Sequence, residues 1–259
     1  MIEEQASFKN SAGQILRGVF HIPKGKGPFP AIIYHHGYRS DKNRHKMLGI
    51  IEKLPACVGF RYDAMGHGES EGDFAETTVS RWVQDLNSAI TFVKQQPYVD
   101  KKRIGVYGSS LGGMALLLAA SQRNDITCIT PICPVSDFKN TMNRKMMTPQ
   151  ENRLWKERGW KPEVIEKKGI TARINYSFYE DGISHDVYAA AKKISCPGLV
   201  VHGTADPVVP LQQSIELVKH NKRLVLHPVT GADHLFTETA HHDEVVDVAS
   251  SFFKKHLTP

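Results

Sequence analysis

The stretch that decides the fold runs from residue 103 to residue 120 and reads RIGVYGSSLGGMALLLAA. Its first part, residues 103–107, is an apolar run of the kind that forms a buried strand. Its last part, residues 114–120, is rich in alanine and leucine, which favour helix. The small residues between them leave room only for a very tight turn. The stretch therefore predicts a strand, a sharp turn and a helix, with Ser110 at the centre of a Gly-x-Ser-x-Gly pattern.

The Gly-x-Ser-x-Gly pattern is what a nucleophilic serine at such a turn requires. The serine sits in strained backbone, and small residues flank it because the helix and the strand approach too closely for side chains. An ordinary glycine-rich turn between strand and helix gives the same five residues by chance. The rest of the chain must therefore show whether the partners of a nucleophilic serine are present.

Length and composition indicate one globular domain over residues 1–259. The chain is 41% hydrophobic and 23% charged, which is ordinary for a soluble enzyme, and no linker divides it. No apolar run approaches the roughly 20 residues of a membrane span, and the N-terminus lacks the basic and apolar regions of a secretory leader. We therefore expect a cytoplasmic protein with no stable membrane insertion. The sequence leaves a homodimer open.

The cysteine spacing argues against disulfides and zinc sites, and the charge distribution argues against nucleic-acid binding. The four cysteines have no C-x-x-C spacing and lie in or beside apolar runs, so we expect reduced, buried thiols. The formal net charge is +6, but residues 139–168 hold nine Lys or Arg against four Glu. This segment alone supplies most of the excess, and the remainder is nearly neutral. We therefore expect no nucleic-acid partner.

Strands and helices alternate along most of the chain. Strands are predicted at 6–10, 14–23, 30–37, 58–63, 103–107, 126–133, 198–202 and 223–229. Helices are predicted at 41–54, 78–95, 114–120, 186–193, 211–220 and 243–256. The alternation predicts a mainly parallel sheet covered on both faces, with the active site at the carboxyl ends of its strands. Residues 136–185 show no clean periodicity.

An acid and a histidine follow two of the later strands. A serine hydroxyl becomes an effective nucleophile when a histidine takes its proton and a carboxylate orients that histidine. Asp206 lies just past one buried strand, and His234 lies just past the last. Asp233 is a rival acid, but as the immediate neighbour of His234 it is poorly placed to meet the ring. The predicted catalytic residues are therefore Ser110, Asp206 and His234.

The choice of His234 among 13 histidines rests on its position in a short loop after the final strand. His202 and His227 fall within predicted strands, where we expect them to be packed or hydrogen-bonded. His241 and His242 open the last predicted helix, and we expect both to be solvated.

Acyl transfer also needs two backbone N–H donors for the developing oxyanion. Leu111 supplies one because it directly follows the nucleophile, and Tyr38, after the strand at 30–37, is the predicted second donor. A simple glycine turn would give the same residues around Tyr38. His35 and His36 are adjacent, but no third ligand lies at a recognisable spacing. We therefore predict no metal and no cofactor.

Five motifs together resemble the α/β-hydrolase superfamily. They are HG at 36–37, DAMGHGES at 63–70, GSSLG at 108–112, HGTADPVVP at 202–210 and GADH at 231–234. Within the superfamily the chain looks most like the cinnamoyl/feruloyl esterases and the monoacylglycerol-lipase-like serine hydrolases. Dienelactone hydrolases and acylaminoacyl peptidases are near relatives. The resemblance covers nearly the whole chain.

The resemblance implies an α/β fold with a mostly parallel eight-stranded sheet flanked by helices. It implies a carboxylic-ester hydrolase that acts through an acyl-enzyme on small ester substrates, hydroxycinnamoyl esters among them. Ser110 would be the nucleophile, His234 the base, Asp206 its orienting acid, and Tyr38 and Leu111 the oxyanion donors. The loop from 63 to 70 resembles a structural loop beside the site. Feruloyl esterases often carry Gln where this chain has Leu111, which weakens that subfamily assignment.

Other readings of the same residues remain. The same triad cleaves thioesters and amides, so thioesterase and acylaminoacyl-peptidase activities are alternatives. A catalytically silent hydrolase fold that serves as a binding protein is a third, and the complete triad argues against it.

The segment 136–185 occupies the position, after the sixth strand, where this superfamily inserts a lid. Its Met and aromatic residues either pack a small subdomain or shape the substrate pocket. Its excess of basic residues either forms a solvated face or attracts a negatively charged group. That group would be the acidic portion of an ester, or a negatively charged surface.

Overall fold

An eight-stranded sheet forms the centre of the computed structural model, which describes residues 1–165 and 169–258. Its strand order is β1-β2-β4-β3-β5-β6-β9-β10. The bounds are β1 (Ile2–Lys9), β2 (Ile15–Ile22), β3 (Phe29–His35), β4 (Val58–Tyr62), β5 (Val99–Ser109), β6 (Cys128–Ile132), β9 (Gly198–Gly203) and β10 (Leu224–Val229). β1 and β2 are antiparallel to their neighbours, and the remaining strands are parallel. The predicted mostly parallel sheet is confirmed.

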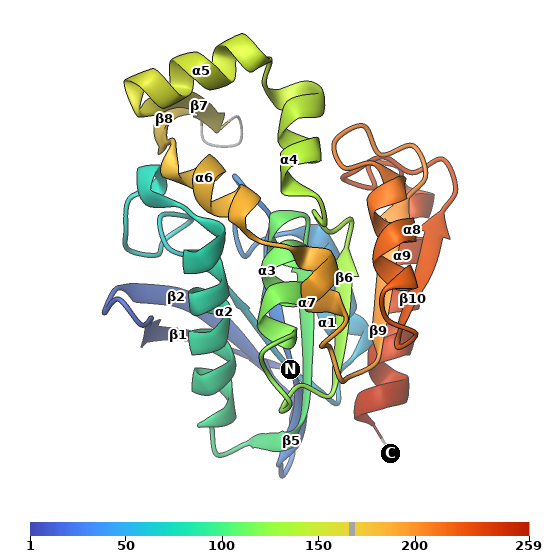
Figure 1. Ribbon diagram of the computed structural model, residues 1–259. Helices are drawn as coiled ribbons and strands as arrows, with labels where there is room; N and C mark the ends of the chain where they lie inside the picture. The colour runs from blue at the N-terminus through green and yellow to red at the C-terminus, as the bar shows by residue number, and fades with distance from the viewer. Residues whose placement is uncertain (166–168, 259) are drawn as a thin grey trace.

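Helices cover both faces of the sheet, as Figure 1 shows. One face carries α1 (His45–Lys53) and α9 (Thr239–Leu257), which pack together over one hydrophobic cluster. The other carries α2 (Val79–Lys94), α3 (Leu111–Ala120), α7 (Val187–Ala191) and α8 (Leu211–Lys219) over a second cluster. A short 3₁₀ helix, η1 (Phe74–Glu76), precedes α2. The central strands are buried on both sides, which explains their continuous apolar runs.

The segment after β6 forms a small unit of its own. It contains α4 (Phe138–Thr141), the π-helical turn η2 (Met142–Met146), α5 (Pro149–Arg158), the antiparallel hairpin of β7 (Trp160–Ile165) and β8 (Ile170–Asn175), and α6 (Ser177–Ser184). Its hairpin is separate from the main sheet. In Figure 1 α5, β7 and β8 lie at the top of the view, beyond the sheet. Residues 166–168 of this predicted insertion, and residue 259 of the predicted domain, lie outside the described residues.

Helix α5 has clear start and stop signals that hydrophobic periodicity alone does not show. Thr148 and Glu151 form a reciprocal capping box, and Pro149 occupies the first turn. Gly159 ends the helix in the left-handed conformation, with φ of 78°. Residues 136–185, which show no clean periodicity in the sequence, therefore contain a capped helix and a hairpin.

Two predicted helix boundaries were wrong. The helix expected at 41–54 begins only at His45, because Asp41 accepts a hydrogen bond from the Asn43 N–H in a local turn. The helix expected at 243–256 begins at Thr239, one turn earlier. Because of the earlier start, His241 and His242 lie within the helix.

The loop after β4 is tied to the loop after β3 by a buried ion pair. The Asp63 carboxylate is fully buried and accepts hydrogen bonds from the Lys42 Nζ at 2.6 Å and the Lys42 backbone N–H at 2.7 Å. The Lys42 ammonium also donates to Glu69 at 2.6 Å. Burial opposes the charge, but these two carboxylates raise the pKa of Lys42 above its ordinary value. The pair holds both loops in place beside the ends of the central strands.

All four cysteines are buried and free, as expected of reduced thiols. Among the described residues, the helices are too short or too polar to cross a bilayer.

Candidate active site

Ser110 occupies a strained turn between β5 and α3. Its φ of 56° and ψ of −116° are unusual for a residue with a side chain. A Cβ on Gly112 would lie 2.2 Å from the His36 carbonyl oxygen, and one on Gly108 would lie 2.4 Å from the Gly112 carbonyl oxygen. Both contacts are with backbone, so only glycine fits at either position. The turn therefore has the geometry of a nucleophile elbow.

Three loops bring Ser110, His234 and Asp206 into a hydrogen-bonded chain. The His234 Nε2 lies 3.0 Å from the Ser110 Oγ, and its Nδ1 lies 2.6 Å from the Asp206 Oδ2. An ionised carboxylate only accepts, so the His234 Nδ1 carries the proton and Nε2 accepts from the Ser110 hydroxyl. The Asp206 side chain is fully buried, and that of His234 is 12% exposed. The geometry is that of a serine–histidine–acid triad.

Hydrogen bonds keep the buried Asp206 ionised. Burial raises its pKa, but the hydrogen bonds from His202 and His234 and from the backbone outweigh burial and hold the pKa well below its ordinary range. Its Oδ1 accepts from the Val208 N–H at 2.8 Å and the Val209 N–H at 2.9 Å. Asp206 therefore remains an anion that can stabilise a protonated His234.

Asp206, His202 and Cys133 offer ligand atoms within 4.8 Å of one another, but their hydrogen bonds do not suit a metal. The His202 Nδ1 lies 2.7 Å from the Ser214 hydroxyl, and its Nε2 lies 2.9 Å from the Val209 carbonyl, which can only accept. The Nε2 therefore carries a proton. Burial raises the pKa of the Cys133 thiol well above its ordinary value. This group is better described as support for Asp206.

The two predicted oxyanion donors lie at the ends of their elements. Leu111 is the first residue of α3, so its N–H has no intrahelical acceptor. The Ala64 N–H donates to the His36 Nε2 at 3.0 Å, so the His36 Nδ1 is protonated and donates to the Gly37 carbonyl at 2.8 Å. Carbonyl and N–H of a trans peptide point in opposite directions. The Tyr38 N–H is therefore turned away from the His36 ring.

The rival residues have other partners. Asp233 accepts from the backbone and hydroxyl of Thr237, at 2.9 and 2.6 Å, which caps the local turn. His227, in β10, pairs with Glu244 at 2.8 Å, and His202 is hydrogen-bonded within β9, so both strand histidines lie as expected.

The expectation of solvated His241 and His242 was wrong. Their side chains are only 16% and 28% exposed. Because α9 begins at Thr239, both lie within its first turns, and His242 lines the cavity beside Ser110. This residue is part of the site that sequence reasoning missed.

A cavity of about 1040 Å³ contains Ser110 and His234 in its wall. Its apolar side is formed by Leu111, Val135, Phe138, Met142, Val164 and Phe178. Several come from the inserted segment, whereas Trp155, Tyr176 and Tyr179 of that segment pack against one another. The Met and aromatic residues of the segment therefore have both roles that the sequence suggested. Some line the cavity, and others pack within the segment.

The basic residues of 139–168 do not reach this cavity. None of the described Lys or Arg side chains of the segment is among its lining residues, and those on α5 are exposed. Lys167 and Lys168 lie outside the described residues, as does the side chain of Lys145. For the basic residues of 139–168 that the structure describes, a solvated face is the better interpretation.

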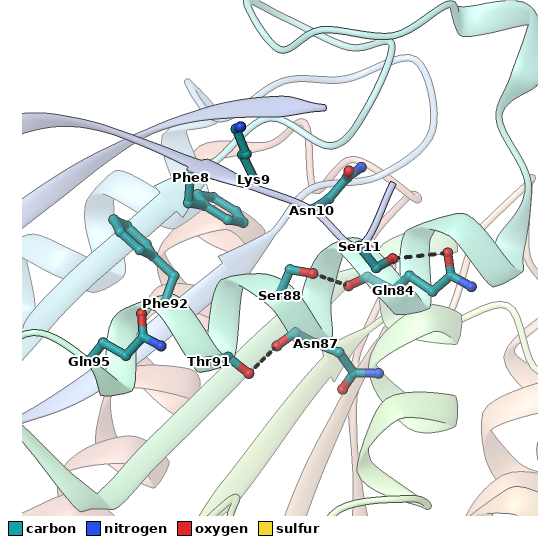
Figure 2. Close-up of a pocket in the computed structure, with 10 residues that line it drawn as sticks. All are labelled: Phe8, Lys9, Asn10, Ser11, Gln84, Asn87, Ser88, Thr91, Phe92 and Gln95. Atoms are coloured by element: carbon teal, nitrogen blue, oxygen red, sulfur yellow. Dashed lines mark hydrogen bonds between the residues drawn. The ribbon is translucent and has the colours of Figure 1, made fainter. Parts of the chain in front are cut away.

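A second hollow lies far from Ser110, between the end of β1 and α2 (Figure 2). Figure 2 shows the Ser88 and Thr91 hydroxyls bonded to backbone carbonyls of their own helix, and the Ser11 hydroxyl bonded to the Gln84 side chain. Phe8 and Phe92 stack at 5.0 Å in its wall. It carries no nucleophile paired with a base.

The sheet, the strained elbow and the Ser110–His234–Asp206 chain define a serine hydrolase of the α/β-hydrolase class. The model of the prolyl oligopeptidase family matches residues 60–259. The chain therefore belongs to that family.

The chain is also similar to curated relatives and to solved structures. The palmitoyl-protein thioesterase ABHD10, mitochondrial, of Mus musculus is 30% identical over 196 residues. The match covers 74% of this chain and 64% of that protein, so the chain spans less than two thirds of this relative.

Est1E from Butyrivibrio proteoclasticus, solved with ferulic acid, superposes with a TM-score of 0.84 at 21% identity, covering 98% of this chain and 100% of that one. The mouse alpha/beta hydrolase domain-containing protein 10 gives 0.77 at 24%, covering 97% and 99%. At 21% and 24% sequence identity, the structural similarity shows a shared fold.

Proposed function

We propose that this protein hydrolyses carboxylic esters through an acyl-enzyme on Ser110, with Asp206 and His234 completing the triad. The observation that carries the proposal is the chain of hydrogen bonds, 3.0 Å from Ser110 to His234 and 2.6 Å from His234 to Asp206, inside a cavity large enough for a substrate. The neutral His234 Nε2 is directed at the hydroxyl whose proton it must accept.

In the first half-reaction the Ser110 Oγ attacks the substrate carbonyl as its proton passes to the His234 Nε2. The new positive charge on the imidazole lies 2.6 Å from the Asp206 carboxylate. The carbonyl oxygen becomes an oxyanion, and the N–H groups of Leu111 and Tyr38 are the proposed donors to it. The bond to the leaving alcohol then breaks, and the alcohol takes the proton from His234. Water repeats the sequence and releases the acid.

The inserted segment, residues 136–185, is proposed to act as a lid. Phe138, Met142, Val164 and Phe178 place its apolar side chains in the cavity wall, where they would contact the acyl or alcohol portion. Aromatic and thioether groups adapt to varied apolar surfaces, which fits small esters, hydroxycinnamoyl esters included.

A thioesterase is the second candidate, and the 30% identical mouse relative is the observation that favours it. The same triad also cleaves amides, so an acylaminoacyl peptidase remains a third. A panel that holds the acyl group constant and varies the leaving group between an alcohol, a thiol and an amine would rank the three activities by kcat/KM.

The central experiment compares Ser110→Ala with wild type on 4-nitrophenyl butyrate and with a fluorophosphonate probe. Loss of both turnover and labelling is expected. Ser121→Ala is the matched control, because the Ser121 hydroxyl only donates to the Leu118 carbonyl at the far end of α3. Turnover by Ser110→Ala at the wild-type rate would rule out the proposed nucleophile.

A further inference from the structure

The cavity has basic as well as apolar lining residues. Arg44, at the N-cap of α1, and Lys46, in the first turn of α1, line it together with His242 of α9. None of the described residues that line the cavity is an Asp or Glu. These basic residues lie outside 139–168, so they are unrelated to the charge excess evident in the sequence.

Lys46 faces the cavity without a carboxylate partner. Its Nζ donates to the Leu235 carbonyl at 3.0 Å and lies 4.6 Å from the centre of the Phe236 ring. No carboxylate oxygen of the described residues lies within 4.0 Å of it. An ammonium has three N–H donors, so two remain for a ligand. Since Leu235 follows His234, these donors lie close to the proposed base.

Arg44 and His242 also have donors or lone pairs to spare. The Arg44 Nε donates to the Ser40 hydroxyl at 2.7 Å, and a guanidinium carries four further N–H donors. The His242 Nε2 is buried and lacks a hydrogen-bond partner among the described residues. Arg39, in contrast, is engaged by Glu163 and by the Val164 carbonyl, both at 3.2 Å.

Several part-buried cations elsewhere among the described residues are paired with carboxylates, whereas the buried Arg61 is bonded to His21 and Asn43 instead. Lys42 binds Asp63, Arg103 binds Asp100 and Arg123 binds Asp125, at distances of 2.6 to 2.7 Å. A half-buried cation without a counterion is unfavourable, because burial removes water that no protein group replaces. Burial accordingly lowers the pKa of Lys46 to about 8. Because Arg44 and Lys46 both line the cavity that contains Ser110, a ligand bound there can supply a counterion.

We propose that Arg44 and Lys46, with His242 beside them, bind an anionic group of the substrate, a carboxylate or a phosphate. The guanidinium offers a planar fork and the ammonium a point charge, and both oxyanions accept from either. The proposal rests on the proposed hydrolase function, since the anion is part of the molecule that Ser110 attacks. It names the substrate class as amphipathic esters, with one apolar and one anionic portion.

Matched substrates test this directly. On the acyl side, 4-nitrophenyl glutarate carries a carboxylate and 4-nitrophenyl glutaramate carries the neutral amide. On the alcohol side, 4-acetoxybenzoate, 4-acetoxybenzamide and 4-acetoxyphenyl phosphate distinguish carboxylate, neutral and phosphate groups. Wild type should prefer one anionic ester over its neutral partner by about 10-fold in kcat/KM. The arm that shows the preference identifies both the side of the scissile bond and the kind of anion.

Variants locate the effect. Lys46→Met and Arg44→Met should each lower the ratio of kcat/KM for the preferred anionic ester to kcat/KM for its neutral partner by about 10-fold. Lys46→Arg should retain most of the preference. Lys156→Met, which removes an exposed cation from α5, is the matched control and should leave the ratio unchanged. Equal losses on charged and neutral esters, or a wild type without any preference, would overturn the proposal.

A binding measurement separates this proposal from the proposed function. With Ser110→Ala, 4-acetoxybenzoate should bind more tightly than 4-acetoxybenzamide, and the added Lys46→Met substitution should abolish the difference. If wild type hydrolyses none of the esters but this difference persists, the hydrolase proposal fails and the anion site stands. If neutral esters are hydrolysed and no binding difference exists, the anion site fails and the hydrolase proposal stands.

Discussion

The ring of Tyr38 stacks on the ring of Phe178 with centroids 5.0 Å apart and planes 13° from parallel. Tyr38, whose N–H is a proposed oxyanion donor, belongs to the loop after β3. Phe178 belongs to α6 of the inserted segment. Beside this stack, Arg39 contacts Glu163 and Val164 of β7. The loop that would stabilise the transition state is thus packed directly against the segment that lines the cavity.

Removing the Phe178 ring should therefore disturb catalysis as well as substrate binding. We expect Phe178→Ala to lower kcat for a neutral ester by about 10-fold, because deleting an oxyanion donor outright costs 10²–10³ and a displaced donor costs less. Phe178→Leu should recover part of the loss. The control is Phe252→Ala on α9, away from the cavity. A change confined to KM would show that Phe178 only contacts substrate.

The two adjacent glycines after the nucleophile should respond differently to alanine. A Cβ on Gly112 would meet the His36 carbonyl oxygen at 2.2 Å, which is fixed backbone. On Gly113 the nearest atom is the Pro134 Cβ at 3.0 Å. Gly112→Ala should destabilise the fold by about 3 kcal/mol or more and abolish activity, whereas Gly113→Ala should be milder. Urea unfolding and ester turnover check both, and similar stabilities for the two variants would contradict the steric reading.

The affinity for an anionic ester should fall as the pH rises through about 8. Burial lowers the pKa of Lys46 to about 8, so its positive charge is present below that pH and lost above it. The ratio of KM for the anionic ester to KM for its neutral partner should rise across pH 7 to 9 in wild type. In Lys46→Met the ratio should stay flat.

Two carboxylates and a thiol act electrostatically on Lys46, and their pKa values lie outside this window. Asp206 and Asp233 have pKa values held below the ordinary range, and that of the Cys133 thiol is raised well above it. Arg44 keeps its charge throughout because a guanidinium is not deprotonated in proteins. A ratio that changes equally in wild type and Lys46→Met would show that Lys46 is not the titrating group.

Asp85 should make the fold less stable as the pH rises from about 4 to about 6. Burial raises its pKa to about 6, against the hydrogen bonds from Met65 and Asn10 that favour the anion. In this window the folded state holds a proton that the unfolded state has lost, so the stability contribution of Asp85 decreases with pH.

The stability of Asp85→Asn provides the measurement. The free energy of unfolding of wild type minus that of Asp85→Asn should fall by about 3 kcal/mol between pH 4 and pH 7. Taking the difference cancels the opposing slope of paired carboxylates such as Asp125, whose pKa is lowered to about 2. A difference that is independent of pH would refute the assignment.

The sequence was most informative where local geometry allows few residue types. The elbow at Ser110 needs glycine on both sides because backbone atoms from β3 and α3 crowd it. Asp206 and His234 could be selected because each follows its own strand, and parallel strands end at one edge of the sheet. Their distances agree with that choice, and their catalytic roles remain predictions that Ser110→Ala and its companions test.

The sequence was least informative where tertiary contacts decide. Arg44 and Lys46 are about 200 residues from His242 in the sequence, and nothing local marks them as neighbours of one cavity. His242 was misjudged because α9 starts a turn earlier than its apolar residues suggest. Helix α5 was overlooked for a different reason. Its periodicity is weak, and the capping box at Thr148 and the glycine at 159 were the signals that define it.

The insertion between β6 and α7 also bears on how the substrate selectivity of such a chain can be changed. It meets the catalytic scaffold at several places, among them Tyr38 with Phe178, Arg39 with β7, and Ser80 with Asp181 at 2.6 Å. Its buried apolar residues also belong to the same hydrophobic cluster as the main sheet. The reacting residues all lie on the other side of those contacts. Exchanging residues 136–185 for the equivalent stretch of a relative, with these junctions kept, offers a modular route to new selectivity on an unaltered nucleophile.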